Sequence, residues 1–171
     1  MQQKIEKINK IQEIKNFFSN DLYNKLFDLS IDSNNYTLTG YDPNGFWDNR
    51  AKKIYPDELV KSLNNEFEIK TNEHGKFNKI VLVKFLDNKS ITMDGKYAVE
   101  PHNINNPPQY WQKLCIINID DSYGGGEIYF PDKNITIKQE KNSAVLFDGN
   151  TIYQINPITY GKKYMLTIFG K

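Results

Sequence analysis

The clearest pair of residues that could do chemistry in this chain is Glu100 and His102. Residues two apart on a β-strand lie on the same face, so a carboxylate and an imidazole would converge there if the strand is regular. Both groups are common metal ligands. Pro101 lies between them and perturbs the strand ladder without forbidding this geometry. In the alternative interpretation, Glu100 is a solvated acid at a strand edge and His102 is an ordinary histidine at a strand end.

Other side chains that could react or bind a metal are better interpreted as core, turn or loop residues. The single cysteine, Cys115, lies inside an apolar run, which indicates a small core residue and not a nucleophile. One cysteine allows no internal disulfide, which is typical of a reducing compartment. Asp120 and Asp121 fall in a predicted hairpin turn, where acids serve the turn rather than a calcium ion. His74 is predicted to lie in a loop.

The N-terminal part of the chain is predicted to be helical. Apolar residues recur every three to four positions from Ile5 to Phe18, which predicts an amphipathic helix. Ser19 or Asn20 can cap a second helix that runs to about Leu29. A third helix is expected to begin near Pro56, because proline is tolerated in a first turn.

The later part of the chain shows short apolar runs separated by turn residues. The predicted strands cover residues 36–39, 79–86, 96–99, 114–119, 127–130, 135–137, 144–147, 152–155 and 164–169. Many short strands argue for a sandwich, jelly roll or barrel, and helices followed by strands make an α+β domain. The length of 171 residues predicts one domain. Its helical part covers residues 1–75 and its strand-rich core covers residues 76–171.

The charge balance excludes several partner classes. The net charge is +1, from 22 basic and 21 acidic residues, so no global field recruits nucleic acid or an anionic membrane. No apolar run approaches the length of a transmembrane helix, and the N-terminus lacks a signal-peptide pattern. We therefore expect a soluble, cytoplasmic protein without nucleic-acid or membrane partners.

A set of motifs in the second half of the chain carries a family resemblance. They are Asn118-Ile119-Asp120, Gly125-Gly126-Glu127, Ser143 to Phe147, and Tyr153-x-Ile155-x-Pro157-Ile158-x-x-Gly161-x-Lys163-Tyr164. In order and spacing, this set resembles the 2-oxoglutarate/Fe(II) dioxygenases of the prolyl hydroxylase type. The segment Tyr97 to Ile104 resembles the stretch of this family that ends in Pro-His-x-Asp. The resemblance implies a double-stranded β-helix (a jelly-roll, cupin-like fold) with N-terminal helices packed on one sheet.

The same resemblance implies where the family's Fe(II) and 2-oxoglutarate would bind. His102 falls on the first metal-ligand position, but Ile104 replaces the acid and Tyr153 replaces the distal histidine. Lys163 falls where the family places the lysine that pairs with the far carboxylate of 2-oxoglutarate. An apolar side chain donates no oxygen, and a phenol with an ordinary pKa of about 10 is a poor ligand for Fe(II). We expect Tyr153 to fill the former metal cavity, with its ring packed and its hydroxyl hydrogen-bonded.

The sequence leaves three functions open. The first is a non-catalytic relative without metal, which binds a peptide, a protein, or a small carboxylate at Lys163. The second is an active Fe(II)/2-oxoglutarate-dependent hydroxylase of a peptide side chain, in which His102 with Glu100 or Tyr153 holds the iron. The third is a structural or partner-binding jelly roll in which even the pocket is closed. As a separate alternative, Lys163 is an ordinary surface lysine. Loss of two direct ligands weakens metal binding severely, so the chemistry favours the first.

Overall fold

The computed structural model describes residues 11–34, 37–38, 50–71, 81–85, 99–102, 113–148 and 151–170. The helical elements are α2 (Asn20–Ile31), α3 (Asp57–Thr71) and the 3-10 helix η2 (Pro131–Lys133). The strands are β1 (Gln12–Ile14), β2 (Thr37–Leu38), β3 (Arg50–Ile54), β4 (Val81–Phe85), β5 (Val99–His102), β6 (Lys113–Asn118), β7 (Gly124–Gly125), β8 (Ile128–Phe130), β9 (Ile135–Ile137), β10 (Ser143–Asp148), β11 (Tyr153–Ile155), β12 (Ile158–Tyr160) and β13 (Lys163–Gly170).

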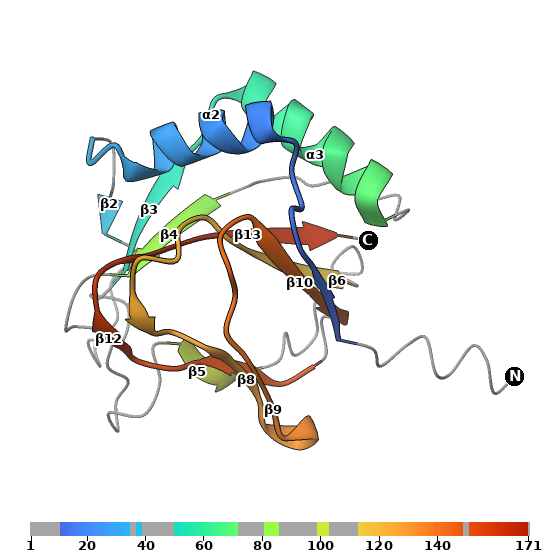
Figure 1. Ribbon diagram of the computed structural model, residues 1–171, viewed down its shortest axis with the longest axis vertical. Helices are drawn as coiled ribbons and strands as arrows, with labels where there is room; N and C mark the ends of the chain where they lie inside the picture. The colour runs from blue at the N-terminus through green and yellow to red at the C-terminus, as the bar shows by residue number, and fades with distance from the viewer. Residues whose placement is uncertain are drawn as a thin grey trace, which may run out of the picture.

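Three antiparallel sheets organise these strands. The large sheet has seven strands in the order β1-β10-β6-β13-β4-β3-β2, and a second sheet has the order β5-β11-β8-β9. The short strands β12 and β7 form a separate pair. Figure 1 shows α2 and α3 on one side of the large sheet and the smaller sheet on its other side. The arrangement confirms the predicted α+β class with N-terminal helices on one sheet. The hydrogen bonds between the described strands do not close a barrel.

Alternation along the three central strands, β6, β10 and β13, divides the buried residues between two cores. The outer core lies between the large sheet and the helices, and its sheet residues include Cys115, Ile117, Ala144, Leu146, Leu166 and Ile168. The inner core joins the large sheet to the smaller one, and its residues include Leu114, Ile116, Val145, Phe147, Met165, Phe130 and Ile155. Asn118 and Lys163 continue the inner-facing series of β6 and β13, so the pleat turns both side chains towards the inner core.

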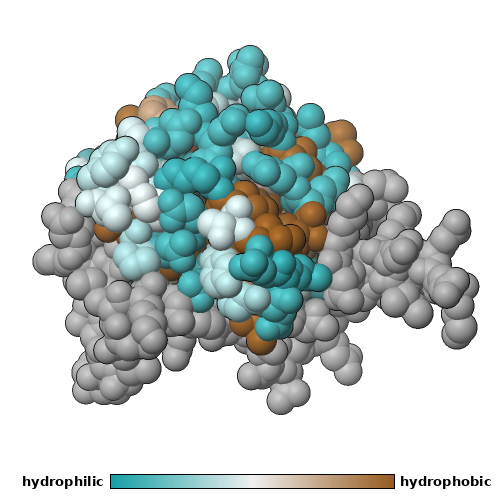
Figure 2. Space-filling model, turned by 60° about the horizontal axis from the view of Figure 1, so that its bottom comes forward, coloured by the Kyte–Doolittle hydropathy of each residue, from teal (hydrophilic) through white to brown (hydrophobic). Residues whose placement is uncertain are grey.

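The two predicted helices form because their apolar residues recur at helical spacing. On α2 the buried stripe contains Leu22 and Leu26, and on α3 it contains Leu59, Leu63 and Phe67. These stripes pack onto the outer face of the large sheet. In the described part of the chain, no helix is long and apolar enough to cross a membrane. Hydrophilic residues dominate the described part of the face in Figure 2, with a hydrophobic area near its centre.

The predicted helix from Ile5 to Phe18 is wrong over its described part. Residues 12–14 form β1, which pairs with β10 at the edge of the large sheet. Asn16 has a φ of 49°, a left-handed conformation that ends any helix. Asn142 then holds the next two residues, because its carbonyl accepts from the N–H of Phe17 at 2.8 Å and its Oδ1 from that of Phe18 at 3.0 Å. Residues 5–10 lie outside the described part of the chain.

Candidate functional site

Lys163 is the first residue of β13 in the large sheet, and its side chain is fully buried, with 0% exposure. Its Nζ donates to Tyr123 Oη at 2.7 Å and to Asn118 Oδ1 at 3.3 Å. The alternative of an ordinary surface lysine is therefore wrong. A lysine is almost never fully buried unless it has a partner, so this position is the strongest functional candidate in the described structure.

Asn118 presents its oxygen to Lys163 because its amide nitrogen is already engaged. Nδ2 donates to the carbonyl of Gln139 at 3.2 Å and to that of Glu140 at 3.3 Å. This pairing assigns Oδ1 to the side of Lys163, where it also accepts a hydrogen bond from Tyr123 Oη at 3.1 Å. Lys163, Tyr123 and Asn118 thus form a closed triangle of hydrogen bonds inside the fold.

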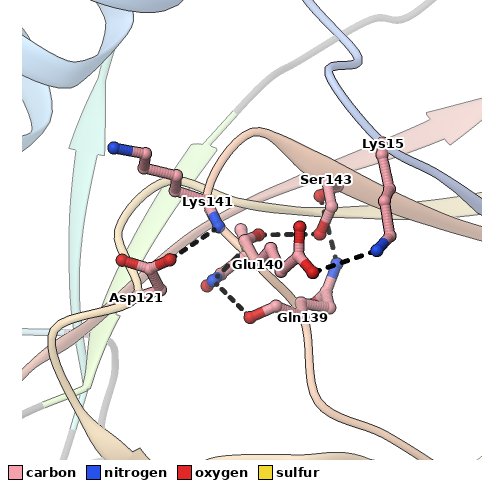
Figure 3. A network of polar contacts seen from close by, with 7 residues as sticks. Lys15, Asp121, Gln139, Glu140, Lys141 and Ser143 are labelled. Atoms are coloured by element: carbon pink, nitrogen blue, oxygen red, sulfur yellow. Dashed lines mark hydrogen bonds and ion pairs between the residues drawn. The ribbon is translucent and has the colours of Figure 1, made fainter.

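The turn before β10 holds those two carbonyls in place. Figure 3 shows the polar contacts of this turn, which involve Lys15, Asp121, Gln139, Glu140, Lys141 and Ser143. The hydroxyl of Ser143 donates to the carbonyl of Glu140 at 2.7 Å, and Gln139 Nε2 donates to the carbonyl of Ser143 at 3.2 Å. Lys15 pairs with the Glu140 carboxylate at 3.0 Å. The orientation of the Asn118 amide is therefore fixed by the fold.

The ring of Tyr123 lies near two lysines. Lys163 Nζ is 4.7 Å from its centroid and Lys138 Nζ is 4.1 Å from it, which are cation–π distances. Lys138 comes from the exposed segment after β9 and donates to the carbonyl of Gly125 at 2.5 Å. Burial raises the pKa of the Tyr123 phenol, so the hydroxyl beside Lys163 stays neutral. We call Lys163, Tyr123, Asn118 and Lys138 the lysine cluster.

The electrostatics of Lys163 disfavour its charged form. The pKa of Lys163 is lowered to about 7, mainly by burial and also by the nearby Lys138, whereas Glu127 acts to raise it. The ion pairs among the described residues join Lys15 to Glu140 and Lys113 to Asp148, and none of them includes Lys163. A buried ammonium without a carboxylate is costly, so a bound anion would stabilise it.

The glycine hairpin packs directly on the stem of Lys163. Gly126 has a φ of +69°, and a Cβ at this position would lie 3.2 Å from Lys163 Cδ, 2.9 Å from Tyr123 Cε2 and 2.7 Å from Ile158 Cδ1. A side chain here would collide with the lysine cluster and strain the backbone. The Gly-Gly-Glu motif therefore lets the chain approach Lys163 closely.

The two positions implied as iron ligands come together in the smaller sheet. The Cα of Tyr153 on β11 lies opposite that of His102 on β5. Ile155 pairs with Val99, so the two pairs are two residues apart on β11 and three residues apart on β5. The register between the strands therefore shifts between these pairs. Ile104 and His74 lie outside the described residues.

The side chain of Tyr153 packs into the inner core. It is 7% exposed, and its ring centroid lies 5.1 Å from that of Phe147, with the rings tilted by 59°. Within the described residues, no group of three or more His, Cys, Asp or Glu side chains could hold a metal ion. A 2-His-1-carboxylate iron site needs such a group.

Comparisons with solved structures find the same fold in three oxygenases. The viral collagen prolyl hydroxylase vCPH from Paramecium Bursaria Chlorella virus-1, solved as a 2OG complex, is 14% identical over 93% of each chain, with a TM-score of 0.61. A prolyl hydroxylase from Trichoplax adhaerens, solved with a hypoxia inducible factor oxygen degradation domain peptide fragment, is 12% identical over 95% of this chain and 83% of that chain, with a TM-score of 0.65. A 2OG-Fe(II) oxygenase family oxidoreductase from Burkholderia pseudomallei is 9% identical over 99% of this chain and 87% of that chain, also with a TM-score of 0.65.

These likenesses confirm the fold that the motifs implied. The chain has the jelly-roll fold of prolyl hydroxylases and 2OG-Fe(II) oxygenases, with two described helices on its large sheet. No protein-family model and no curated protein matches the sequence. Fold alone does not fix function, because the chemistry depends on the residues of the site.

Proposed function

We propose that this protein is a non-catalytic relative of the prolyl hydroxylases that has lost the iron site and binds a small carboxylate at Lys163. The observation that carries the proposal is the buried Nζ of Lys163, whose described partners are two neutral oxygens. The charged form of this lysine lacks a matching anion among the described residues. A carboxylate would supply that charge and accept the remaining N–H of the ammonium.

The ligand class follows from the size and charge of the lysine cluster. One ammonium is buried and a second, that of Lys138, lies on the same aromatic ring, so a small mono- or dicarboxylate suits the site better than a neutral molecule. The position of Lys163 in the motif pattern supports a 2-oxoglutarate-like acid. A structure with this fold was solved as a 2OG complex, which agrees with that class.

The loss of iron is proposed from the residues at the ligand positions. The chain contains two histidines, His74 and His102, and the distal ligand position holds Tyr153 instead of a third. The Tyr153 ring is packed against Phe147 in an apolar core. Ile104 offers no oxygen in the place of the acid. A peptide partner is also consistent with this fold, because the Trichoplax adhaerens prolyl hydroxylase was solved with a peptide fragment. The single buried thiol, Cys115, suits a reducing, cytoplasmic setting.

Calorimetric titration without metal tests the carboxylate site. 2-Oxoglutarate and glutarate should bind to the wild type in the presence of a chelator, and Lys163→Met should abolish binding. Lys162→Met is the matched control, because Lys162 is the exposed neighbour of Lys163 and should leave affinity unchanged. Absence of binding at millimolar ligand would refute the carboxylate site and favour a purely structural or partner-binding role.

Anaerobic titration of Fe(II) or Mn(II), with and without 2-oxoglutarate, tests the loss of iron. We expect no metal binding at millimolar concentrations by the wild type or His102→Ala. Micromolar binding that 2-oxoglutarate strengthens and His102→Ala removes would instead establish the active hydroxylase. In that case His102 with Glu100 or Tyr153 would hold the metal.

A further inference from the structure

We propose that Lys163 also forms a reversible imine with the carbonyl group of a small 2-oxo acid, whose carboxylate pairs with Lys138. The inference rests on the proposed function, because the acid must reach the lysine cluster. It goes beyond that function by making Lys163 a nucleophile and not only a counter-ion. It also defines the ligand as an acid that carries a carbonyl group.

The two hydrogen bonds of Lys163 suit a neutral amine as well as the ammonium that pairs with a carboxylate. A neutral amine has two N–H donors and one lone pair, and the described partners are two acceptors. Asn118 Oδ1 can only accept, because the Nδ2 of the same amide is committed to backbone carbonyls. Tyr123 Oη donates its own proton to Asn118, so it accepts from Lys163. Both N–H donors are thus used, and no described hydrogen bond occupies the lone pair.

The surroundings of Lys163 are those of an activated amine. Lysine becomes nucleophilic near neutral pH when it is desolvated or lies beside another cation. Lys163 meets both conditions, because its side chain is fully buried and Lys138 shares the ring of Tyr123. The lowered pKa of about 7 agrees with this geometry. A lysine with this lowered pKa has a much larger neutral fraction at neutral pH than an exposed lysine.

Lys138 provides the second contact that a 2-oxo acid needs. In such an acid the carboxylate adjoins the carbonyl carbon, so the two groups require an amine and a cation close together. Lys138 is exposed but held over the Tyr123 ring at 4.1 Å, and its Nζ also donates to the carbonyl of Gly125. Its ammonium thus stays near the ring that Lys163 Nζ also contacts, and it can pair with a carboxylate.

The chemical step is a condensation without any oxidant. The lone pair of Nζ forms a C–N bond to the carbonyl carbon, and the electron pair of the C=O bond moves to oxygen, which takes a proton. Nitrogen loses its protons as the C=N bond forms, and the hydroxyl leaves with a proton as water. Tyr123 Oη, 2.7 Å from Nζ, is placed to relay a proton between nitrogen and oxygen.

Reductive trapping tests this inference on the whole protein. Wild type is incubated at neutral pH with 2-oxoglutarate and cyanoborohydride, which reduces an imine to a stable secondary amine, and every lysine is then mapped by peptide mass spectrometry. Lys163 should be labelled at least about tenfold faster than any other lysine, because an ordinary lysine has about a thousandfold less neutral amine at neutral pH. Lys138→Met should slow this labelling, and Lys163→Arg should remove the adduct.

Glutarate, which lacks the carbonyl, separates this inference from the proposed function. Saturating glutarate should suppress labelling of Lys163 in the wild type without affecting exposed lysines, so the test does not depend on how well a variant folds. If 2-oxoglutarate and glutarate both bind through Lys163 but no adduct forms there, the imine is refuted and the carboxylate site stands. If neither ligand binds and no adduct forms, both proposals fail. Equal labelling of all lysines would also overturn the imine.

Discussion

Replacing Lys163 by methionine should stabilise the protein at low pH more than at high pH. The lysine is fully buried, and burial moves its pKa from 10.5 in the unfolded chain to about 7 in the fold. Between these two values the unfolded state binds a proton that the folded state lacks, so wild-type stability rises with pH. Below about pH 7 both states are protonated and the full cost of the buried charge is present. Methionine has a similar length and carries no charge.

The size of the effect follows from the two pKa values. Their separation corresponds to about 5 kcal/mol of destabilisation when Lys163 is charged in the fold. By about pH 9 the folded lysine is neutral, and about 2 kcal/mol of that cost remains. The gain in the free energy of unfolding of Lys163→Met over the wild type should therefore be about 3 kcal/mol larger near pH 6 than near pH 9. Loss of the two hydrogen bonds to Lys163 subtracts a pH-independent amount.

Urea unfolding without added carboxylate, followed across this pH range, measures the difference directly. Lys162→Met serves as the control, because an exposed lysine should show no such dependence. Adding glutarate should stabilise the charged form of Lys163 and flatten the wild-type curve. A difference between Lys163→Met and wild type that does not change with pH would show that Nζ is solvated, and the electrostatic argument for an anion site would fail.

Three further substitutions test separate parts of the structure. Gly126→Ala should destabilise the fold by about 2–3 kcal/mol, seen as a lower urea midpoint, because its Cβ meets packed atoms at positive φ. Ser30→Ala should cost about 1–3 kcal/mol in the same assay, because it removes a buried hydroxyl that lies 2.6 Å from Tyr55 Oη. Lys138→Met should raise the pKa of Lys163, so the pH at which trapping reaches half its maximum should move upward. An unchanged urea midpoint would contradict the close packing at Gly126 or the hydrogen bond of Ser30. An unchanged trapping pH would contradict the charge coupling between Lys138 and Lys163.

Local patterns predicted most of the described elements. The helices α2 and α3 and the strands β6, β8, β9, β10, β11 and β13 fall where helical spacing or short apolar runs placed them. Over its described part, the first predicted helix is wrong because residues 12–14 pair with β10 as an edge strand. Pairing of Gln12 with Leu146 joins segments far apart in sequence, and no local pattern reports such a contact. The short strands β7 and β12 were not predicted, because glycine, asparagine and proline residues lie in or next to them and indicate turns.

The site was predicted only in part. Motif spacing singled out Lys163, but its burial and its two partners depend on which strands are neighbours. Asp120 lies in the predicted turn, and its carboxylate accepts from the N–H of Asp121 and the hydroxyl of Ser122. Lys138 lies in an exposed segment after β9 and carries no local signal. The alternation along β6 does predict the direction of the Asn118 side chain, because Asn118 continues the inward-facing series of Leu114 and Ile116.

The placement of the two sites explains how one could be lost while the other is kept. Lys163 and Asn118 belong to the large sheet, and the turn before β10 braces them independently of the smaller sheet. Tyr153 and His102 pair within the smaller sheet, and Tyr153 contacts the large sheet through Phe147. Replacing a metal ligand by an aromatic residue there extends an apolar core that already exists, which stabilises the fold by burial. The same replacement removes no hydrogen bond from the described lysine cluster. The proposed loss of the iron site would therefore leave the proposed carboxylate site at Lys163 intact.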